Sequence, residues 1–238
     1  MIKRKLICGL LMILIGAVGS PLLQAGNLSG QVDFMSRYMW RGWDLNPDKK
    51  PVLQPSLTYA FGDSGFSANI WFSLNFEKEN EEVNETDITL TYDFKLSEAF
   101  TLSAGIIHYG WYLAKNFTFK KNTTHELFVS AALPKVPLNP SATLYYDFDG
   151  DKGTYILFSI SKSVQVGAVG GLDLSAALGY NGGLFLDKEK GLSDLTIGAA
   201  LPLKLGSLSL TGMANYTFVL LDEIGTDDHL WFGLSLAF

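Results

Sequence analysis

The amino-acid sequence predicts an all-β fold, a transmembrane antiparallel up-and-down β-barrel of about 12 strands. Three observations predict this fold. The chain begins with the pattern of an export signal, and most of the remainder alternates apolar and polar residues over long segments. Along the chain, mostly short connections between these segments alternate with mostly long ones. Long segments matter because about 9 to 11 residues of a tilted strand cross a bilayer, whereas most strands of globular proteins have five or six.

The first 25 residues predict a cleaved secretory signal peptide. Residues 3–5 are the basic triplet KRK, residues 6–18 are apolar, and Ala25 ends a plausible cleavage site. The apolar run is shorter than the roughly 20 residues of a membrane-spanning helix, which disfavours the alternative of an uncleaved anchor. We therefore expect two parts, the signal peptide 1–25 and an exported barrel over 26–238.

The composition of the mature chain limits its partners. Without the signal peptide, the 18 Lys and Arg of the whole chain become 15, while all 24 Asp and Glu remain. This acidic balance argues against nucleic acid as a partner, because nucleic-acid binding needs a basic face. Cys8, the single cysteine, lies in the signal peptide, so we expect no disulfide, thiol chemistry or cysteine metal site. No cofactor is expected either.

Twelve segments follow the period of two that indicates a β-strand. In FSANIWFSLNF (66–76), one face carries only Phe, Ala, Ile and Leu, and the other carries Ser, Asn and Trp. The predicted strands are 28–42, 52–61, 66–76, 86–96, 100–112, 124–133, 141–149, 154–164, 172–180, 192–203, 208–220 and 228–238.

The connections fall into two kinds. Those after even-numbered strands are mostly short, as in GDSG (62–65) and SEA (97–99). Those after odd-numbered strands are mostly longer and polar, as in WDLNPDKKP (43–51) and EKENEEVNE (77–85). Outer-membrane barrels have this arrangement, with short periplasmic turns and long external loops. An even strand number also returns both ends of the chain to the same side of the membrane.

A soluble periplasmic β-sandwich or lipocalin-like barrel is the alternative, since a soluble β-sheet protein also has one apolar and one polar face. Two features favour the membrane barrel. The polar faces are rich in Ser, Thr, Asn, Gly and Asp and poor in Lys and Glu, which suits a crowded lumen better than a water-facing surface. Aromatic residues gather near the strand ends, where a barrel crosses the two membrane interfaces. Because lipid offers no partners to an open sheet edge, the twelfth strand is expected to pair with the first.

The last segment, HLWFGLSLAF (229–238), stays apolar on one face up to its final residue. It resembles the terminal assembly signal of bacterial outer-membrane barrels. The resemblance implies that the barrel-assembly machinery recognises Leu234, Leu236 and Phe238, and that the protein lies in the lipid of a bacterial outer membrane.

The first hairpin, residues 36–61, resembles the start of the TorF-type putative porins. In that family a Tyr-x-x-Arg-Gly block is followed by a Pro-x-x-Gln block. The matching positions here are Tyr38, Arg41, Gly42, Pro51 and Gln54. The resemblance covers this hairpin and implies a porin-like protein. Arg37 departs from the pattern, because a small polar residue is expected at that position.

The predicted lumen is acidic, with two arginines on one wall. Arg37 and Arg41 fall on the inward face of the first strand, and the seventh strand lies opposite in a ring of twelve. We therefore expect a constriction where arginines face carboxylates, and the excess of inward acids predicts a mild preference for cations. The residues assigned to the pore lining and constriction are Asp33, Arg37, Arg41, Asp87, Asp93, Glu126, Tyr145, Asp147, Asp149 and Asp194.

These features predict a channel-forming, porin-like protein that lets small polar solutes cross the outer membrane. Charged residues inside small barrels often pair and fill the interior, so a non-conducting structural or surface scaffold is the alternative. An enzyme is not expected. His125 and Ser130 do not share a face, and no inward metal-ligand cluster completes a catalytic site.

Overall fold

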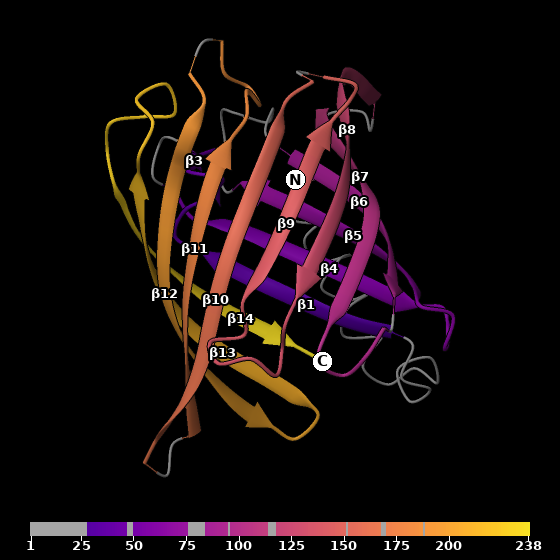
Figure 1. Cartoon of the computed structure of the whole chain (residues 1–238), viewed down its shortest axis with the longest axis vertical. Coiled ribbons are helices and arrows are strands. Elements are labelled where there is room, and N and C mark those ends of the chain that lie inside the picture. Colours follow the sequence, from indigo (N-terminus) through magenta and orange to yellow (C-terminus); the bar gives the residue numbers. More distant parts are fainter. Residues whose placement is uncertain are drawn as a thin grey trace, which may run out of the picture.

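The computed structural model shows a closed barrel of 12 antiparallel strands and a separate two-stranded hairpin (Figure 1). The structure describes residues 28–46, 50–75, 84–94, 96–113, 118–150, 152–167, 170–187 and 189–238. The predicted signal peptide and its cleavage site at Ala25 lie outside these residues. The strands are β1 (Leu28–Met35), β2 (Met39–Trp40), β3 (Trp43–Asp44), β4 (Val52–Ala60), β5 (Phe66–Asn75), β6 (Asn84–Phe94), β7 (Thr101–Leu113), β8 (Thr118–Ala132), β9 (Ser141–Asp147), β10 (Thr154–Val166), β11 (Gly170–Asn181), β12 (Gly191–Leu205), β13 (Leu208–Val219) and β14 (His229–Ala237).

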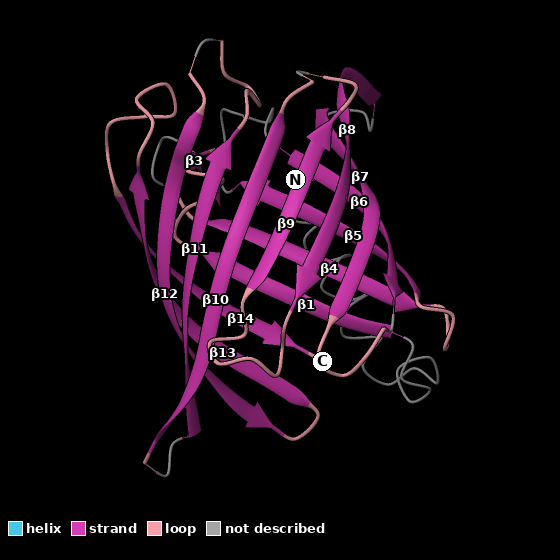
Figure 2. Cartoon of the chain, viewed as in Figure 1, coloured by secondary structure: helices cyan, strands magenta, loops and turns pink. Residues whose placement is uncertain are grey.

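Consecutive wall strands pair with one another, and the barrel closes between the first and the last. β1 pairs with β4 on one side and with β14 on the other. Backbone hydrogen bonds run in both directions between Gly30 and Phe238, at 3.2 and 3.0 Å. Figure 2 shows the wall as tilted strands joined by loops. The predicted fold class and the pairing of the last strand with the first are confirmed. The described residues contain no helix that is both long and apolar enough to span a membrane.

The outer face of the barrel is apolar, and the inner face buries polar residues. In β14, more than half of the surface of Leu230, Phe232 and Leu234 is exposed, whereas Ser235 is 6% exposed. The alternation of a strand thus directs its apolar side chains outward, an arrangement suited to contact with lipid.

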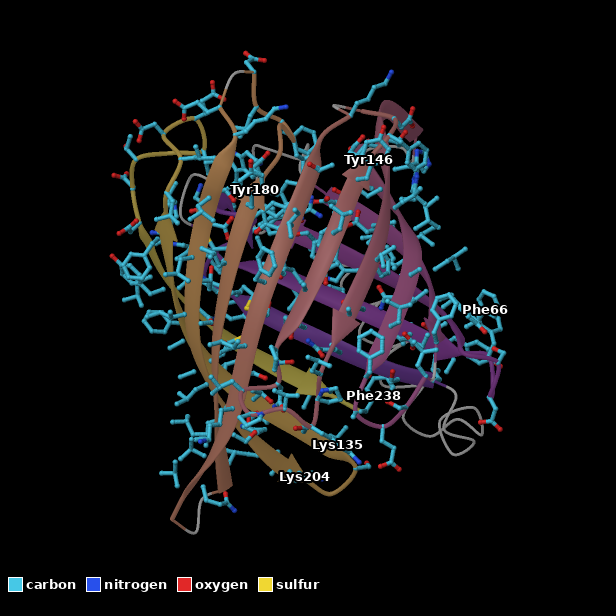
Figure 3. All side chains as sticks on the ribbon, in the orientation of Figure 1. Phe66, Lys135, Tyr146, Tyr180, Lys204 and Phe238 are labelled. Atoms are coloured by element: carbon cyan, nitrogen blue, oxygen red, sulfur yellow. The ribbon has the colours of Figure 1, made fainter. Side chains whose placement is uncertain are left out.

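Aromatic residues lie toward both ends of the barrel (Figure 3). Tyr146 and Tyr180 lie toward the upper end in this view, Phe238 lies below the middle, and Phe66 lies at the right-hand edge, at the start of β5. Aromatic side chains are favoured at the two membrane interfaces, because their rings are apolar and their edges or hydroxyls tolerate water.

The prediction of one strand over 28–42 is wrong in its second half. β1 ends at Met35, and Ser36 continues the contact with β14, because its amide donates to the carbonyl of Phe232 and its hydroxyl accepts the amide hydrogen of Phe232, at 2.9 Å each. The following residues turn away from β4 and form the hairpin β2–β3. Its side chains contact β6, β8, β9 and β10, so the hairpin lies inside the barrel.

The other predicted strands agree with the structure to within two residues at each end, with one exception. β8 begins at Thr118 and not at residue 124, so the predicted loop over 113–123 is partly strand. β9 ends at Asp147, which leaves Asp149 beyond the strand.

Candidate functional site

The hairpin β2–β3 turns at Arg41 and Gly42. Both residues have positive φ angles, 50° and 90°, and the flanking residues Trp40 and Trp43 pair with each other. Positive φ at both central residues is the geometry of a type I′ turn, whose twist matches that of the two strands. The Arg-Gly sequence therefore reverses the chain inside the barrel and places Arg41 at the tip of the hairpin.

Arg41 forms an ion pair with Glu126 of β8. Its Nη1 and Nη2 atoms donate to Oε1 and Oε2 at 2.6 and 2.7 Å, and the hydroxyl of Tyr109 donates to Oε2 at 2.8 Å. The side chains of Arg41 and Glu126 are 7% and 2% exposed. A buried bidentate pair of this kind fixes the geometry of both partners, and loss of either one leaves a buried charge uncompensated.

Three aromatic rings surround the guanidinium of Arg41. Its Cζ atom lies 4.5 Å from the ring centroid of Trp40, 4.4 Å from that of Tyr145 and 4.6 Å from that of Tyr155. The Tyr155 hydroxyl donates to Asp194 at 3.0 and 3.2 Å, which fixes the position of its ring. Cation–π contacts strengthen when they are shielded from water, so the rings and Glu126 together stabilise a buried positive charge.

Carboxylates dominate the buried charge of the lumen. The buried ones are Asp33, Glu85, Asp87, Glu126, Asp147 and Asp194. Among the ion pairs that the structure describes, the pair between Arg41 and Glu126 is the one that includes a buried carboxylate from this group. The others rely on neutral donors. Thr124, for example, donates to Asp147 at 2.6 Å. An excess of buried negative charge in a low-dielectric channel attracts cations.

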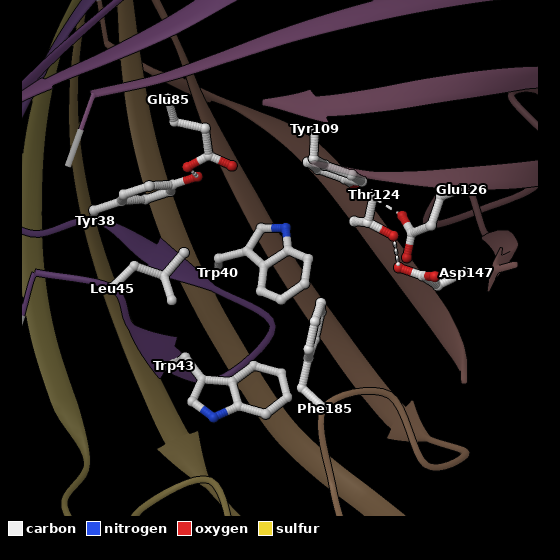
Figure 4. Close-up of a pocket in the computed structure, with 10 residues that line it drawn as sticks. All are labelled: Tyr38, Trp40, Trp43, Leu45, Glu85, Tyr109, Thr124, Glu126, Asp147 and Phe185. Atoms are coloured by element: carbon white, nitrogen blue, oxygen red, sulfur yellow. Dashed lines mark hydrogen bonds between the residues drawn. The ribbon is translucent and has the colours of Figure 1, made fainter. Parts of the chain in front are cut away.

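A cavity of about 270 Å³ lies between the hairpin and the wall formed by β6 to β9 (Figure 4). Figure 4 shows the Tyr38 hydroxyl directed at Glu85 and the rings of Trp43 and Phe185 on the opposite side. The cavity thus combines aromatic surfaces with carboxylates. Its lining residues are Tyr38, Trp40, Trp43, Leu45, Glu85, Tyr109, Thr124, Glu126, Asp147 and Phe185.

The loop after β11 packs against the hairpin. Asn181 holds this loop, because its side chain accepts the amide hydrogen of Leu184 at 2.7 Å and donates to the carbonyl of the same residue at 3.0 Å. Leu184 is completely buried. The ring of Phe185 lies 5.8 Å from that of Trp40 and 6.4 Å from that of Trp43. The loop between β11 and β12 therefore helps to hold the hairpin within the lumen.

The structure brings several of the predicted lining residues together. Arg41 contacts both Glu126 and Tyr145, and Asp194 binds a tyrosine that packs on Arg41. Asp147 and Glu126 line one cavity. The expected opposition of arginine and carboxylate is a direct contact and not a field across an open lumen. The hairpin causes this difference, because it carries Arg41 away from the wall of β1.

Two predicted lining residues lie in other places than expected. Arg37 is not on the inward face of a wall strand, since it belongs to the segment leading into the hairpin and pairs with Asp44 at 2.6 Å. Asp149 follows the end of β9, is half exposed, and accepts a hydrogen bond from Nδ1 of His125 at 2.8 Å. The predicted placement of both residues on wall strands is wrong, because the predicted strands extend too far, and their part in lining a pore stays a prediction.

The remaining predicted residues lie on wall strands. Asp33 is buried on β1, and Asp87 is buried on β6. Asp93, at the far end of β6, is exposed and accepts a hydrogen bond from Ser103 at 2.6 Å. Asp93 lies six residues after Asp87, which is about 20 Å farther along β6.

Several residues of the site are absent from the predicted set. Alternation extended by two residues from Asp87 toward the start of β6 would have included Glu85. The Arg-Gly turn could have indicated the hairpin. No comparable pattern indicates the loop residue Phe185. The missed residues are Tyr38, Trp40, Trp43, Glu85, Tyr109, Tyr155 and Phe185. Among the described residues, no group of three or more His, Cys, Asp or Glu side chains is placed to hold a metal ion.

A family model matches residues 23–217, which is about four-fifths of the chain. Its description is "Bacterial protein of unknown function (Gcw_chp)". The chain belongs to the Gcw_chp family. The comparison with curated proteins gives no match. Membership of Gcw_chp does not test the TorF-type resemblance.

Solved structures similar to this Gcw_chp protein are mainly porins. The KdgM porin has a TM-score of 0.58 at 11% identity, over 88% of this chain and 98% of that chain. The NanC porin has a TM-score of 0.54 at 12% identity, over 89% and 98%. An outer membrane channel from Pseudomonas putida F1 has a TM-score of 0.50 at 10% identity, over 89% and 94%. This Gcw_chp protein therefore has the porin-like β-barrel fold of outer-membrane proteins.

Proposed function

We propose that this protein is an outer-membrane channel for small hydrophilic solutes, with a preference for cations. The observation that carries the proposal is the set of six buried carboxylates inside a closed barrel, of which the ion pair with Arg41 neutralises one. Rings of carboxylates favour cations, and burial strengthens their field. The hairpin β2–β3 is the constriction of this channel, because it narrows the lumen at the level of Arg41.

The acidic lumen also bears on the class of solute. One KdgM structure is described as the "KdgM porin in complex with disordered oligogalacturonate". Oligogalacturonate carries a carboxylate on each sugar unit, so a lumen with excess buried carboxylates would repel it. The similarity in fold to the KdgM porin therefore does not indicate that this protein carries an anionic solute.

A non-conducting scaffold is the second candidate, and one observation favours it. Trp40, Trp43 and Phe185 pack together within the lumen, and Arg41 joins the hairpin to the wall. If these contacts persist, the hairpin closes the lumen to solutes.

Several assignments belong to the same proposal. The signal peptide is cleaved near Ala25, and Leu234, Leu236 and Phe238 form the signal that the barrel-assembly machinery recognises. The protein resides in outer-membrane lipid and belongs to the TorF-type porins. It carries solutes without catalysis. The exposed apolar face of β14 and its pairing with β1 support the assembly signal.

Single-channel recording of the purified protein in a planar bilayer tests the channel function. In a gradient of KCl, we expect discrete openings and a reversal potential of the sign that cation preference gives. Openings with anion preference would contradict the assigned selectivity. Reproducible insertion without openings would establish the scaffold instead.

A further inference from the structure

Glu85 and Asp87 form an acidic pair on the lumen face of β6. They are 3% and 9% exposed. Their cross-strand neighbours on β5 are Ser73, which is 2% exposed, and Trp71, whose ring lies 5.6 Å from that of Tyr38. Residues two apart on a strand point to the same face, with Cα atoms about 7 Å apart, so a single ligand group can lie between the two carboxylates.

The hydrogen-bond partners of this pair are incomplete. The Tyr38 hydroxyl donates to Oε2 of Glu85 at 2.8 Å, and the backbone of Gly110 supplies a hydrogen bond to Asp87. Oδ1 of Asp87 is buried and has no hydrogen-bond partner. In the part of the chain that the structure describes, no Lys or Arg forms an ion pair with either carboxylate, and Arg41 is paired with Glu126. A buried carboxylate oxygen without a donor is unfavourable, and a cationic donor would relieve this cost.

The cavity next to the pair supplies a surface for the rest of a ligand. Glu85 lines the cavity, and so does Tyr109, which faces Asp87 across the β6–β7 ladder. The far side of the cavity is formed by the rings of Trp43 and Phe185 (Figure 4). A compact apolar group in the cavity would lie against these rings, with its charged end at the carboxylates.

We infer that the Glu85–Asp87 pair and the adjoining aromatic cavity bind a small primary ammonium compound. The ammonium group lies between the two carboxylates and donates to Oδ1 of Asp87, and the apolar body lies against Trp43 and Phe185. The inference rests on the proposed function and names the solute class of that channel. Two features select this class. The unpartnered oxygen needs a hydrogen-bond donor, which a quaternary ammonium lacks, and the aromatic walls suit an alkyl group better than a hydrated metal ion.

Calorimetric titration of the purified protein in detergent micelles with three probes tests the inference. Butylammonium has the charge, the N–H donors and a body small enough for a cavity of about 270 Å³. Tetramethylammonium has the charge without donors, and butyrate has the body with the opposite charge. We expect binding of butylammonium, binding of tetramethylammonium that is weaker by about tenfold or more, and no binding of butyrate. Absence of butylammonium binding, or equal binding of the two cations, would overturn the inference.

Variants on one strand localise the binding. Asp87→Asn and Glu85→Gln keep the size of each side chain and are expected to weaken butylammonium binding by about tenfold or more. Asp93→Asn is the matched control, because Asp93 is an exposed carboxylate on the same strand whose oxygen is already paired with Ser103. It should change binding by less than about twofold. If Asp93→Asn weakens binding as much as Asp87→Asn, the site is not at the acidic pair. Should a variant fail to fold, the three probes on the unaltered protein still decide the matter.

The calorimetric result separates this inference from the channel function. Conduction of cations without binding of butylammonium would support the proposed function and contradict the binding site. Binding of butylammonium through Asp87 without channel openings would support the binding site and contradict the channel function.

Discussion

The barrel wall and the hairpin inside it are stabilised in different ways. The wall is a continuous ladder in which every strand pairs with two neighbours, and its exposed Leu and Phe side chains are suited to lipid. The hairpin has only the short β2–β3 ladder, and it is held in the lumen by side-chain contacts centred on Arg41. The wall therefore distributes its stability over many equivalent bonds, whereas the hairpin depends on a few.

This difference predicts which region responds to a single substitution. Loss of one outward side chain leaves the hydrogen bonds of the ladder in place, because they are made by the backbone. Loss of one partner from a buried ion pair leaves the other charge without compensation, and this costs about 3–5 kcal/mol. Substitutions in the hairpin should thus change the lumen before they change the barrel.

The largest effect is expected for Arg41→Ala. The substitution removes the bidentate partner of Glu126 and the cation that Trp40, Tyr145 and Tyr155 surround, so the hairpin should lose about 3–5 kcal/mol of its attachment to the wall. We expect larger single-channel conductance and stronger cation preference, because the negative charge of Glu126 becomes uncompensated. Planar-bilayer recording measures both quantities.

A double variant is the control for this prediction. Adding Glu126→Gln to Arg41→Ala removes the uncompensated charge but does not restore the ion pair. The conductance should stay high, and the cation preference should fall toward that of the unaltered protein. Conductance and selectivity of Arg41→Ala that match those of the unaltered protein would show that Arg41 lies outside the conducting path.

A smaller effect, on the wall, is expected for Leu90→Arg. Leu90 lies in the middle of β6 and is 51% exposed on the outer face. An arginine near the bilayer midplane costs about 2–4 kcal/mol, so the urea midpoint of the protein in lipid vesicles should fall. Thr91→Arg is the control, because it places the same charge on the lumen face of the same strand. Equal destabilisation by both variants would argue against the assigned outer face.

The wall could be predicted from the sequence because its pattern is local. The alternation of residues such as Leu230, Phe232 and Leu234 indicates a strand with a lipid-facing side, and lipid offers no partners to an open sheet edge, so the sheet is expected to close. The same rule explains why most strand ends agree with the structure to within two residues. It also explains why Asp87 and Glu126 could be placed on the inner face without knowledge of their partners.

The hairpin could not be predicted from alternation, because the alternation continues through it. Arg37, Met39 and Arg41 keep the period of two, yet β1 ends at Met35. The hairpin is defined by the left-handed turn at Arg41 and Gly42 and by contacts to strands far along the chain, such as the contact with Glu126 on β8. Such contacts depend on the closed barrel and leave no periodic signal in the sequence.

The smallest of these effects is expected at the turn itself, for Gly42→Ala. Gly42 has a φ of 90°, and an added Cβ would lie 3.1 Å from Cβ of Asp194 and 3.3 Å from Cγ2 of Ile224. Gly206, in the turn between β12 and β13, has a φ of 67°, and an added Cβ there meets nothing within 4 Å. Each substitution strains the backbone by about 1–3 kcal/mol, but only Gly42→Ala also crowds the lumen.

Gly42→Ala should therefore loosen the hairpin and raise the conductance, in the same direction as Arg41→Ala but by less. Gly206→Ala should lower the urea midpoint of the barrel while leaving the conductance unchanged. If both variants changed only the urea midpoint, the hairpin would unfold together with the wall. The conclusion that its attachment depends separately on Arg41 would then be wrong.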